Sequence, residues 1–190
     1  MTDIVEQKKA LRAQIKERKK TLTPANIEQQ ARDTFTKFSS FEPFLRATTI
    51  LAYWSLPDEL PTHEIVNHWL ETTSKRILLP VVNGNDLELY EYTGPECLQS
   101  QPPFGILEPR GTQRVDPSEV DLVVVPGVAF DLAKHRLGRG RGYYDRLFPQ
   151  MPNATRVGVC LREQMVSAVP CEPHDLLMDF LFYEGSNPLI

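Results

Sequence analysis

The sequence predicts an α/β fold: a single three-layer α/β/α domain built around a mostly parallel sheet. Apolar, β-branched runs alternate along the chain with segments of helical periodicity. This alternation is typical of parallel strands joined by covering helices. The length of 190 residues suits one compact domain over residues 1–190. The hydrophobic content of 41% is ordinary for a soluble globular protein.

Two helices are predicted at the start of the chain. Residues 3–20 have helical periodicity, with apolar side chains on one face and basic side chains on another. The apolar face holds Ile4, Leu11 and Ile15, and the basic face holds Lys8, Arg12 and Lys16. Thr23 then resembles an N-cap with Pro24 at the first helical position, so a second helix is expected to begin there.

Strand and helix signals alternate through the middle of the chain. Strands are expected at residues 48–55, 76–82 and 87–92. Thr62 is expected to cap a helix with Trp69 on its buried side. Residues 93–111 contain many prolines and glycines and are predicted to form a loop, which is long enough to suggest a functional role.

The run "VDLVVVPG" at residues 120–127 is the clearest buried strand, because a continuous apolar stretch stops there at Pro-Gly. Further strands are expected at 155–161 and 179–184, and "YYDRLF" at 143–148 is expected to be helical. In parallel sheets ligands bind beyond the carboxyl ends of the strands, and the loop after Val125 lies at such an end.

Composition and spacing narrow the classes of function. No apolar run approaches the ~20 residues that span a bilayer. The first 20 residues carry acids and lack the apolar core of a signal peptide. We therefore expect a cytoplasmic protein without a membrane partner. Three cysteines and four histidines show neither C-x-x-C nor H-E-x-x-H spacing, so no protein-built transition-metal site is expected.

The net charge of −4 is unevenly distributed. Residues 1–46 hold 10 Lys/Arg against 6 Asp/Glu, and the remainder of the chain is acidic. Local basic regions in an acidic protein favour small anionic ligands over a long nucleic acid, which requires a broad basic face. We expect no nucleic-acid partner.

The stretch "RLGRGRGYYD" at residues 136–145 carries the strongest functional signal. Alternating glycines allow positive φ angles and a close approach of backbone N–H groups to an anion, and arginines can bind phosphate oxygens bidentately. A helix starting near Gly142 would add its N-terminal amides, and Asp145 could hold the magnesium ion of a triphosphate. The stretch matches neither G-x-G-x-x-G nor G-x-x-x-x-G-K-[ST]. A solvated surface turn and an RGG-like RNA contact are the alternatives.

The sequence resembles the 5-formyltetrahydrofolate cyclo-ligase family, also called 5,10-methenyltetrahydrofolate synthetases. The resemblance rests on "PGVAFD" (126–131) followed by "RLGRGRGYYD", with "KKALR" (8–12), "SLPDE" (55–59) and "PHDLLMD" (173–179) in chain order. It implies an ATP-dependent closure of 5-formyltetrahydrofolate to 5,10-methenyltetrahydrofolate with release of ADP and phosphate. It also implies a ligase of folate one-carbon metabolism that uses Mg²⁺. We expect a monomer, and a folate substrate that can be polyglutamylated.

Matching positions imply roles for individual residues. ATP binding is implied for Lys8, Lys9, Arg12, Arg136, Leu137, Gly138, Arg139, Gly140, Arg141, Gly142, Tyr143 and Tyr144. Folate binding is implied for Arg12, Trp54, Glu59, Phe104, Arg139, Gly140, Tyr143 and Tyr144. Magnesium binding is implied for Asp145 and Asp175, and we select Arg139 and Arg141 as the catalytic cations. Many relatives carry lysine at the position of Arg141, so here a planar fork replaces a point charge.

Each assignment has a simpler structural alternative. Without the family pattern, Lys8 and Arg12 are better read as a solvated basic helix face. Glu59 can be a solvated loop acid, and the two tyrosines can be ordinary packing residues. Asp175, next to His174, can equally be a local cap or surface ion pair, and His135 is interpreted as a surface histidine. The alternative function is a non-catalytic folate- or nucleotide-binding regulator, which would lack a phosphate or metal position; none is missing here.

Overall fold

A seven-stranded sheet forms the centre of the molecule in the computed structural model, which describes residues 3–101, 105–172 and 175–186. The strand order is β12-β10-β7-β1-β2-β3-β6. The strands are β1 (Thr49–Leu51), β2 (Arg76–Asn83), β3 (Asp86–Glu91), β6 (Arg114–Val115), β7 (Leu122–Val125), β10 (Thr155–Val159) and β12 (Phe180–Phe182). The first five strands in this order, from β12 through β10, β7 and β1 to β2, pair in parallel. The strand β3 pairs antiparallel with both β2 and β6. The prediction of an α/β fold with a mostly parallel sheet is confirmed.

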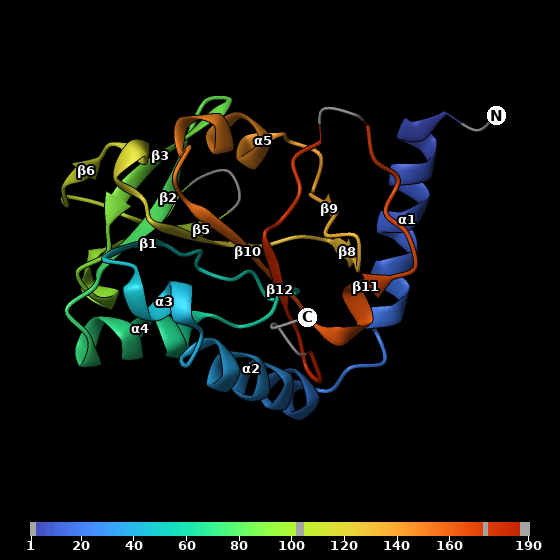
Figure 1. The fold of residues 1–190 in the computed structure, drawn as a ribbon, viewed down its shortest axis with the longest axis horizontal. Helices are drawn as coiled ribbons and strands as arrows, with labels where there is room; N and C mark the ends of the chain where they lie inside the picture. The colour runs from blue at the N-terminus through green and yellow to red at the C-terminus, as the bar shows by residue number, and fades with distance from the viewer. Residues whose placement is uncertain (1–2, 102–104, 173–174, 187–190) are drawn as a thin grey trace.

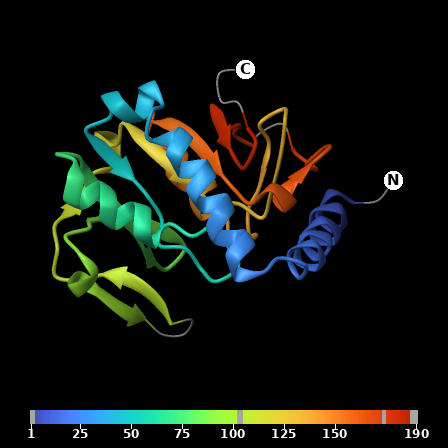
Figure 2. The same cartoon turned by 90° about the horizontal axis from the view of Figure 1, so that it is seen from below.

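Three helices cover one face of this sheet: α2 (Pro24–Phe38), α3 (Glu42–Arg46) and α4 (His63–Thr72). Figure 2 shows them together on the side facing the viewer. They bury an aromatic cluster in which Phe38 stacks on Trp69 at a centroid distance of 5.4 Å and meets Phe182 of β12 edge-on at 5.1 Å. Such pairs add about 0.5–1.5 kcal/mol beyond their burial, so this face is the firm core of the fold.

The opposite face is covered by α5 (Tyr143–Leu147) and the 3₁₀ turn η3 (Phe148–Gln150). Leu51, Val123 and Val125 point to this side and pack with Leu147 and Phe148. Their neighbours along the strands point to the aromatic cluster instead, as the alternation of side chains in a strand requires. Helices on both faces therefore give the expected three layers.

The first helix, α1 (Ile4–Lys19), packs on a second sheet instead of the central one. This small sheet has the order β11-β8-β9, with β8 (Ala129–Asp131), β9 (Arg136–Leu137) and β11 (Met165–Val166). Leu11 and Ile15 of α1 contact its apolar side. Figure 1 shows α1 standing at the end of the molecule beside β8 and β11.

Several predicted details differ from the structure. The strand expected at 48–55 is only β1, three residues long. The loop expected at 93–111 contains the turn η1 (Pro95–Cys97) and a hairpin of β4 (Leu98–Gln101) and β5 (Ile106–Pro109). The helix α3 and the turns η2 (Pro117–Glu119) and η4 (Arg162–Gln164) have no counterpart in the prediction. No helix in the described ranges has the length and apolar character needed to cross a bilayer.

The two predicted N-caps have different outcomes. Thr23 caps α2 in a reciprocal capping box with Asn26, as expected. Thr62 precedes α4, but its side chain makes no capping hydrogen bond. Its Oγ1 instead donates to the carbonyl of Tyr53 at 2.5 Å and accepts from the amide of Ser55 at 3.1 Å. The capping prediction for Thr62 is wrong because its hydroxyl fixes the buried chain that leaves β1.

Candidate active site

A cleft of about 790 Å³ opens beyond the carboxyl ends of β1 and β7. Its walls come from α1, from the chain that follows β1, from the chain between β7 and α5, from the hairpin strand β5, and from Glu172, Asp175 and Leu176. Segments far apart in sequence therefore meet at the edge where parallel α/β sheets usually bind ligands. We refer to this cavity as the cleft.

The glycine-arginine segment 138–142 crosses the cleft in a conformation that only glycine adopts easily. Gly140 has φ +96° and Gly142 has φ +67°. A Cβ atom on Gly140 would lie 3.4 Å from Nη2 of Arg12, so a side chain there would touch a cation of the cleft. Gly142 directly precedes α5, which begins at Tyr143. The helix start predicted near Gly142 is confirmed.

Arg136 is a nearly buried cation beneath this segment. Its side chain is 7% exposed. Nη2 lies 3.0 Å from Oδ1 of Asp145 and Nη1 donates to the carbonyl of Pro126 at 3.2 Å. The guanidinium lies 5.4 Å from the ring centroid of Tyr144, a cation–π arrangement. Arg136 thus links the end of β7 to the first turn of α5.

Arg139 extends from the segment toward the loop that follows β1. Its Nε and Nη2 donate to Oε1 of Glu59 at 3.1 and 3.0 Å, and Nη2 also donates to Oδ1 of Asp58 at 2.6 Å. Burial lowers the pKa of Arg139, but the two carboxylates outweigh it and the net pKa is raised. Arg141 is exposed and lines the same cleft.

Two basic residues of α1 point into the cleft from the opposite wall. Lys8 Nζ lies 2.9 Å from Asp175 and 3.1 Å from Glu172, and Nε of Arg12 donates to the carbonyl of Gly138 at 2.9 Å. Burial lowers the pKa of Arg12; burial also opposes the charge of Lys8, but the two acids raise its pKa overall. The structure does not bring Lys9 to the cleft: its side chain is 76% exposed and lies beside Glu6.

The expected folate positions occupy the wall formed by the chain after β1. Trp54 stacks on His63 with a centroid distance of 4.2 Å. Glu59 is buried, with Oε2 accepting from the amide of Leu56 at 3.0 Å and Oε1 bound to Arg139. Tyr143 and Tyr144 line the cleft at the start of α5, and burial raises the pKa of Tyr144. Phe104 lies outside the described residues.

The two expected metal positions, Asp145 and Asp175, both line the cleft. Asp145 is 57% exposed and paired with Arg136, and Oδ2 of Asp175 accepts from Lys8 and from the amide of Glu172. Among the described residues, no cluster of three His, Cys, Asp or Glu has metal-binding geometry. Mg²⁺ usually takes one or two carboxylates and fills its shell with water and phosphate oxygens, so the hard oxygens of these two aspartates fit that ion.

Sequence reasoning missed other residues of the site. Ile106 and Leu107 of β5 form an apolar wall of the cleft, but the hairpin that carries them was expected to be an irregular loop. Glu172 approaches Lys8 beside the expected Asp175. Asp58, which binds Arg139, lies inside the motif "SLPDE". Its negative charge next to Glu59 is the only feature of the sequence that points to such a role. His174 lies outside the described ranges.

Comparison with known proteins gives consistent results. The model of the "5-formyltetrahydrofolate cyclo-ligase family" matches residues 4–184. A 5-formyltetrahydrofolate cyclo-ligase of Escherichia coli K12 is 30% identical over 170 residues, covering 85% of this chain and 92% of the relative. The cyclo-ligase of Mus musculus is 26% identical over 192 residues, covering 94% of each chain. The NMR structure of Aquifex aeolicus 5,10-methenyltetrahydrofolate synthetase has a TM-score of 0.84 at 32% identity, covering 94% of this chain and 90% of that one.

Proposed function

The chain belongs to the 5-formyltetrahydrofolate cyclo-ligase family, and from this membership we propose that it closes the ring of 5-formyltetrahydrofolate at the expense of ATP. The products are 5,10-methenyltetrahydrofolate, ADP and phosphate. The enzyme is thus a carbon–nitrogen ring-forming ligase of folate metabolism.

One observation supports the proposal above the others. Cations of α1, cations of the glycine-arginine segment and apolar side chains of β5 surround one cleft. The α1 cations and the segment are more than half of the chain apart in sequence. A triphosphate needs converging cations and backbone amides, and a pterin ring needs an apolar wall with a few polar groups. The cleft offers both within one cavity.

The chemistry requires activation of a poor electrophile. The formyl group on nitrogen-5 is amide-like, and its oxygen leaves badly. The formyl oxygen attacks the γ-phosphorus, ADP leaves, and an iminium phosphate remains. Nitrogen-10 then attacks the formyl carbon, loses its proton, and phosphate departs. Phosphoryl transfer demands mainly positioning and charge neutralisation, which is the kind of work that the arginines of the cleft can perform.

Within this proposal the side chains divide into two groups. Lys8, Arg12, Arg136 and the backbone of residues 137–142 bind the nucleotide, with Arg139 and Arg141 neutralising the transferred phosphoryl group. Trp54, Glu59, Tyr143 and Tyr144 bind the folate, with Glu59 accepting from the pterin N–H edge. The buried position of Glu59 and its bond to Arg139 support a shared boundary between the two substrates.

We also propose that Asp145 and Asp175 hold Mg²⁺. The ion would supply positive charge at the phosphates of ATP. The present chain supplies the two carboxylates, while Arg136 and Lys8 beside them limit the excess negative charge before a ligand arrives. Three further properties remain predictions: that the protein acts as a monomer of one domain, that it accepts polyglutamylated folates, and that it is cytoplasmic. The thiols of Cys97, Cys160 and Cys171 are free, which agrees with a reducing compartment.

The deciding experiment mixes the protein with ATP, Mg²⁺ and 5-formyltetrahydrofolate and follows the absorbance of the methenyl product. We expect product to accumulate with one ADP released per turnover, and no product when a non-hydrolysable ATP analogue replaces ATP. Tight binding of both ligands without turnover would instead identify a regulatory protein of the same fold. Consumption of ATP only with other substrates would also contradict the proposal.

A further inference from the structure

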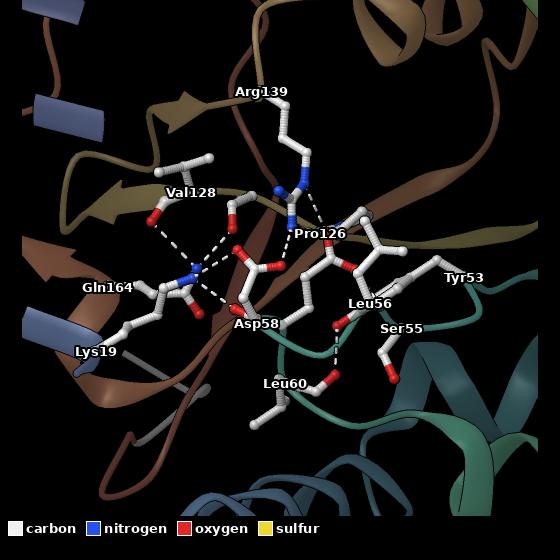
Figure 3. Close-up of polar contacts among 12 residues, drawn as sticks. Lys19, Tyr53, Ser55, Leu56, Asp58, Leu60, Pro126, Val128, Arg139 and Gln164 are labelled. Atoms are coloured by element: carbon white, nitrogen blue, oxygen red, sulfur yellow. Dashed lines mark hydrogen bonds and ion pairs between the residues drawn. The ribbon is translucent and has the colours of Figure 1, made fainter. Parts of the chain in front are cut away.

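A line of ionic contacts runs from the end of α1 to Arg139 through Asp58 (Figure 3). Nζ of Lys19 donates to the backbone carbonyl of Asp58 at 2.5 Å and to its Oδ2 at 3.2 Å. The other carboxylate oxygen of Asp58, Oδ1, accepts from Nη2 of Arg139 at 2.6 Å. Asp58 therefore connects the last residue of α1 with the glycine-arginine segment.

These contacts hold one edge of the Arg139 guanidinium. In the described part of the chain, the hydrogen bonds of Arg139 use Nε and Nη2, which bind Glu59 and Asp58, and none uses Nη1. Since the guanidinium is planar and rigid, fixing the Nε–Nη2 edge also fixes the direction of Nη1. Glu59 is itself held by a hydrogen bond from the amide of Leu56, so the carboxylates of Asp58 and Glu59 hold the guanidinium in one orientation.

The negative charge of Asp58 persists at working pH. Burial raises the pKa of Asp58, but Arg139 and Lys19 outweigh burial and lower it overall. The Lys19 side chain is only 13% exposed, although it is a lysine at a helix end. Neither Asp58 nor Lys19 is among the residues that line the cleft. Their contacts with the cleft therefore run through Arg139 and through the loop that carries Asp58.

We propose that Asp58 and Lys19 are positioning residues for Arg139. Lys19 fixes the backbone and carboxylate of Asp58, and Asp58 with Glu59 orients the guanidinium so that Nη1 meets the transferred phosphoryl group. This inference rests on the proposed function, in which Arg139 neutralises that group. Small displacements of a charged catalytic group are costly because phosphoryl transfer depends on alignment.

The first test compares Asp58→Asn and Lys19→Met with Lys20→Met. Lys20 is the matched control, since it is the neighbouring lysine but pairs with Glu17 at 2.8 Å and is 63% exposed. Asp58→Asn should lower kcat about tenfold, as expected for loss of one charge-assisted hydrogen bond. Lys19→Met should lower kcat about threefold, and Lys20→Met should leave it unchanged. KM for ATP should stay within about twofold in all three, because ground-state binding uses several other cations.

The second test is a double-mutant cycle with Arg139→Lys. A lysine has no planar edge for Asp58 to hold, so Asp58→Asn should reduce kcat little further in the Arg139→Lys background. Asp58→Glu should restore part of the kcat lost in Asp58→Asn. An equal loss in both backgrounds would overturn the inference, since a purely structural effect of Asp58 does not depend on the residue at 139.

The outcomes separate this inference from the proposed function. A wild-type protein that forms no methenyl product contradicts the function itself. An active wild type with unchanged kcat in both Asp58→Asn and Lys19→Met overturns the positioning role alone. A fall in kcat accompanied by a large rise in both KM values and a melting temperature lowered by more than about 2 °C also overturns it, because α1 would then merely be loosened. If Asp58→Asn does not fold, the Lys19→Met and Lys20→Met pair decides.

Discussion

Individual charged side chains of the cleft are held by partners of opposite sign. Arg136 pairs with Asp145, and Lys8 lies between Glu172 and Asp175. An unpaired charge that is partly removed from water is costly, and these partners reduce that cost in the free protein. The positions of the cations are therefore set before a ligand binds, which lowers the entropy lost on binding.

His63 provides a prediction of pH dependence at the scale of one residue. Burial lowers its pKa below the ordinary histidine value of 6.5, and the hydrogen bond to the carbonyl of Ser55 opposes this only in part. Because the folded pKa is below the unfolded one, the unfolded chain takes up the proton first as pH falls. The contribution of His63 to stability is therefore complete above pH 6.5 and is lost as pH falls from 6.5 through the folded pKa.

We expect the free energy of unfolding of the wild type, relative to His63→Phe, to decrease between pH 7.5 and pH 5.5 in urea titrations. Phenylalanine keeps an aromatic ring against Trp54 but does not titrate. His68→Gln, which changes an exposed histidine of the same helix, serves as the control and should follow the wild type. A constant difference between wild type and His63→Phe across this range would show that the ring is not held neutral by burial.

At the scale of the element, the glycine-arginine segment gives a second prediction. Gly140→Ala should lower the free energy of unfolding by about 1–2 kcal/mol, because an L-residue is strained at φ +96°. It should also lower kcat/KM, since relief of this strain would shift the backbone amides of the segment and the new Cβ would touch Nη2 of Arg12 at 3.4 Å.

Gly111→Ala is the matched control for this prediction. Gly111 also has positive φ, at +73°, but a Cβ there meets nothing within 4 Å, and Gly111 does not line the cleft. Its substitution should cost similar stability in urea titrations while leaving turnover intact. Equal losses of turnover in both variants would mean that backbone strain alone, and not the neighbourhood of Arg12, explains the effect.

The strands show which parts of the fold sequence patterns can predict. Apolar runs located β2, β7 and β10 because local hydrophobicity alone marks a buried strand. They overestimated β1, because the chain after Leu51 turns to satisfy the buried hydroxyl of Thr62. They missed the β4–β5 hairpin, whose position depends on a distant contact: Oε1 of Glu108 accepts from the amide of Val82 at 2.9 Å.

The candidate site also has a part that local sequence predicts and a part that depends on contacts between distant residues. The spacing of Gly138, Gly140 and Gly142 is local, and it predicted an unusual backbone that the φ angles of the last two bear out. The link from Lys19 through Asp58 to Arg139 joins residues 39 and 81 positions apart. No periodicity or local motif encodes such a contact, because it is created only when α1 and the loop after β1 fold against the segment.

At the scale of the whole molecule, α1 is a wall of the cleft that buries few of its own side chains, two of its 16 residues. Its buried residues in the described structure are Leu11 and Ile15, which rest on the small sheet. By contrast, α2 belongs to the aromatic cluster on the far face. A ligand that binds Lys8 and Arg12 should therefore add stability to α1 in particular.

Hydrogen exchange can measure this difference. With a non-hydrolysable ATP analogue and Mg²⁺ at about 100 times Kd, amides of α1 and of residues 138–142 should exchange up to about 100-fold more slowly, equivalent to about 2.7 kcal/mol. Amides of α2 that open only locally should change little. Binding of the analogue with unchanged exchange in α1 would contradict the placement of α1 in the nucleotide site.

The ion pair between Lys8 and Asp175, 167 positions apart, also bears on how the protein becomes active during its synthesis. A ribosome makes the first of these residues early and the second late, so a growing chain can complete most of its central sheet while its cleft still lacks part of a wall. A chain that ends directly before residue 175 should therefore be catalytically silent, and it should also be less stable because it lacks Phe182 of the aromatic cluster.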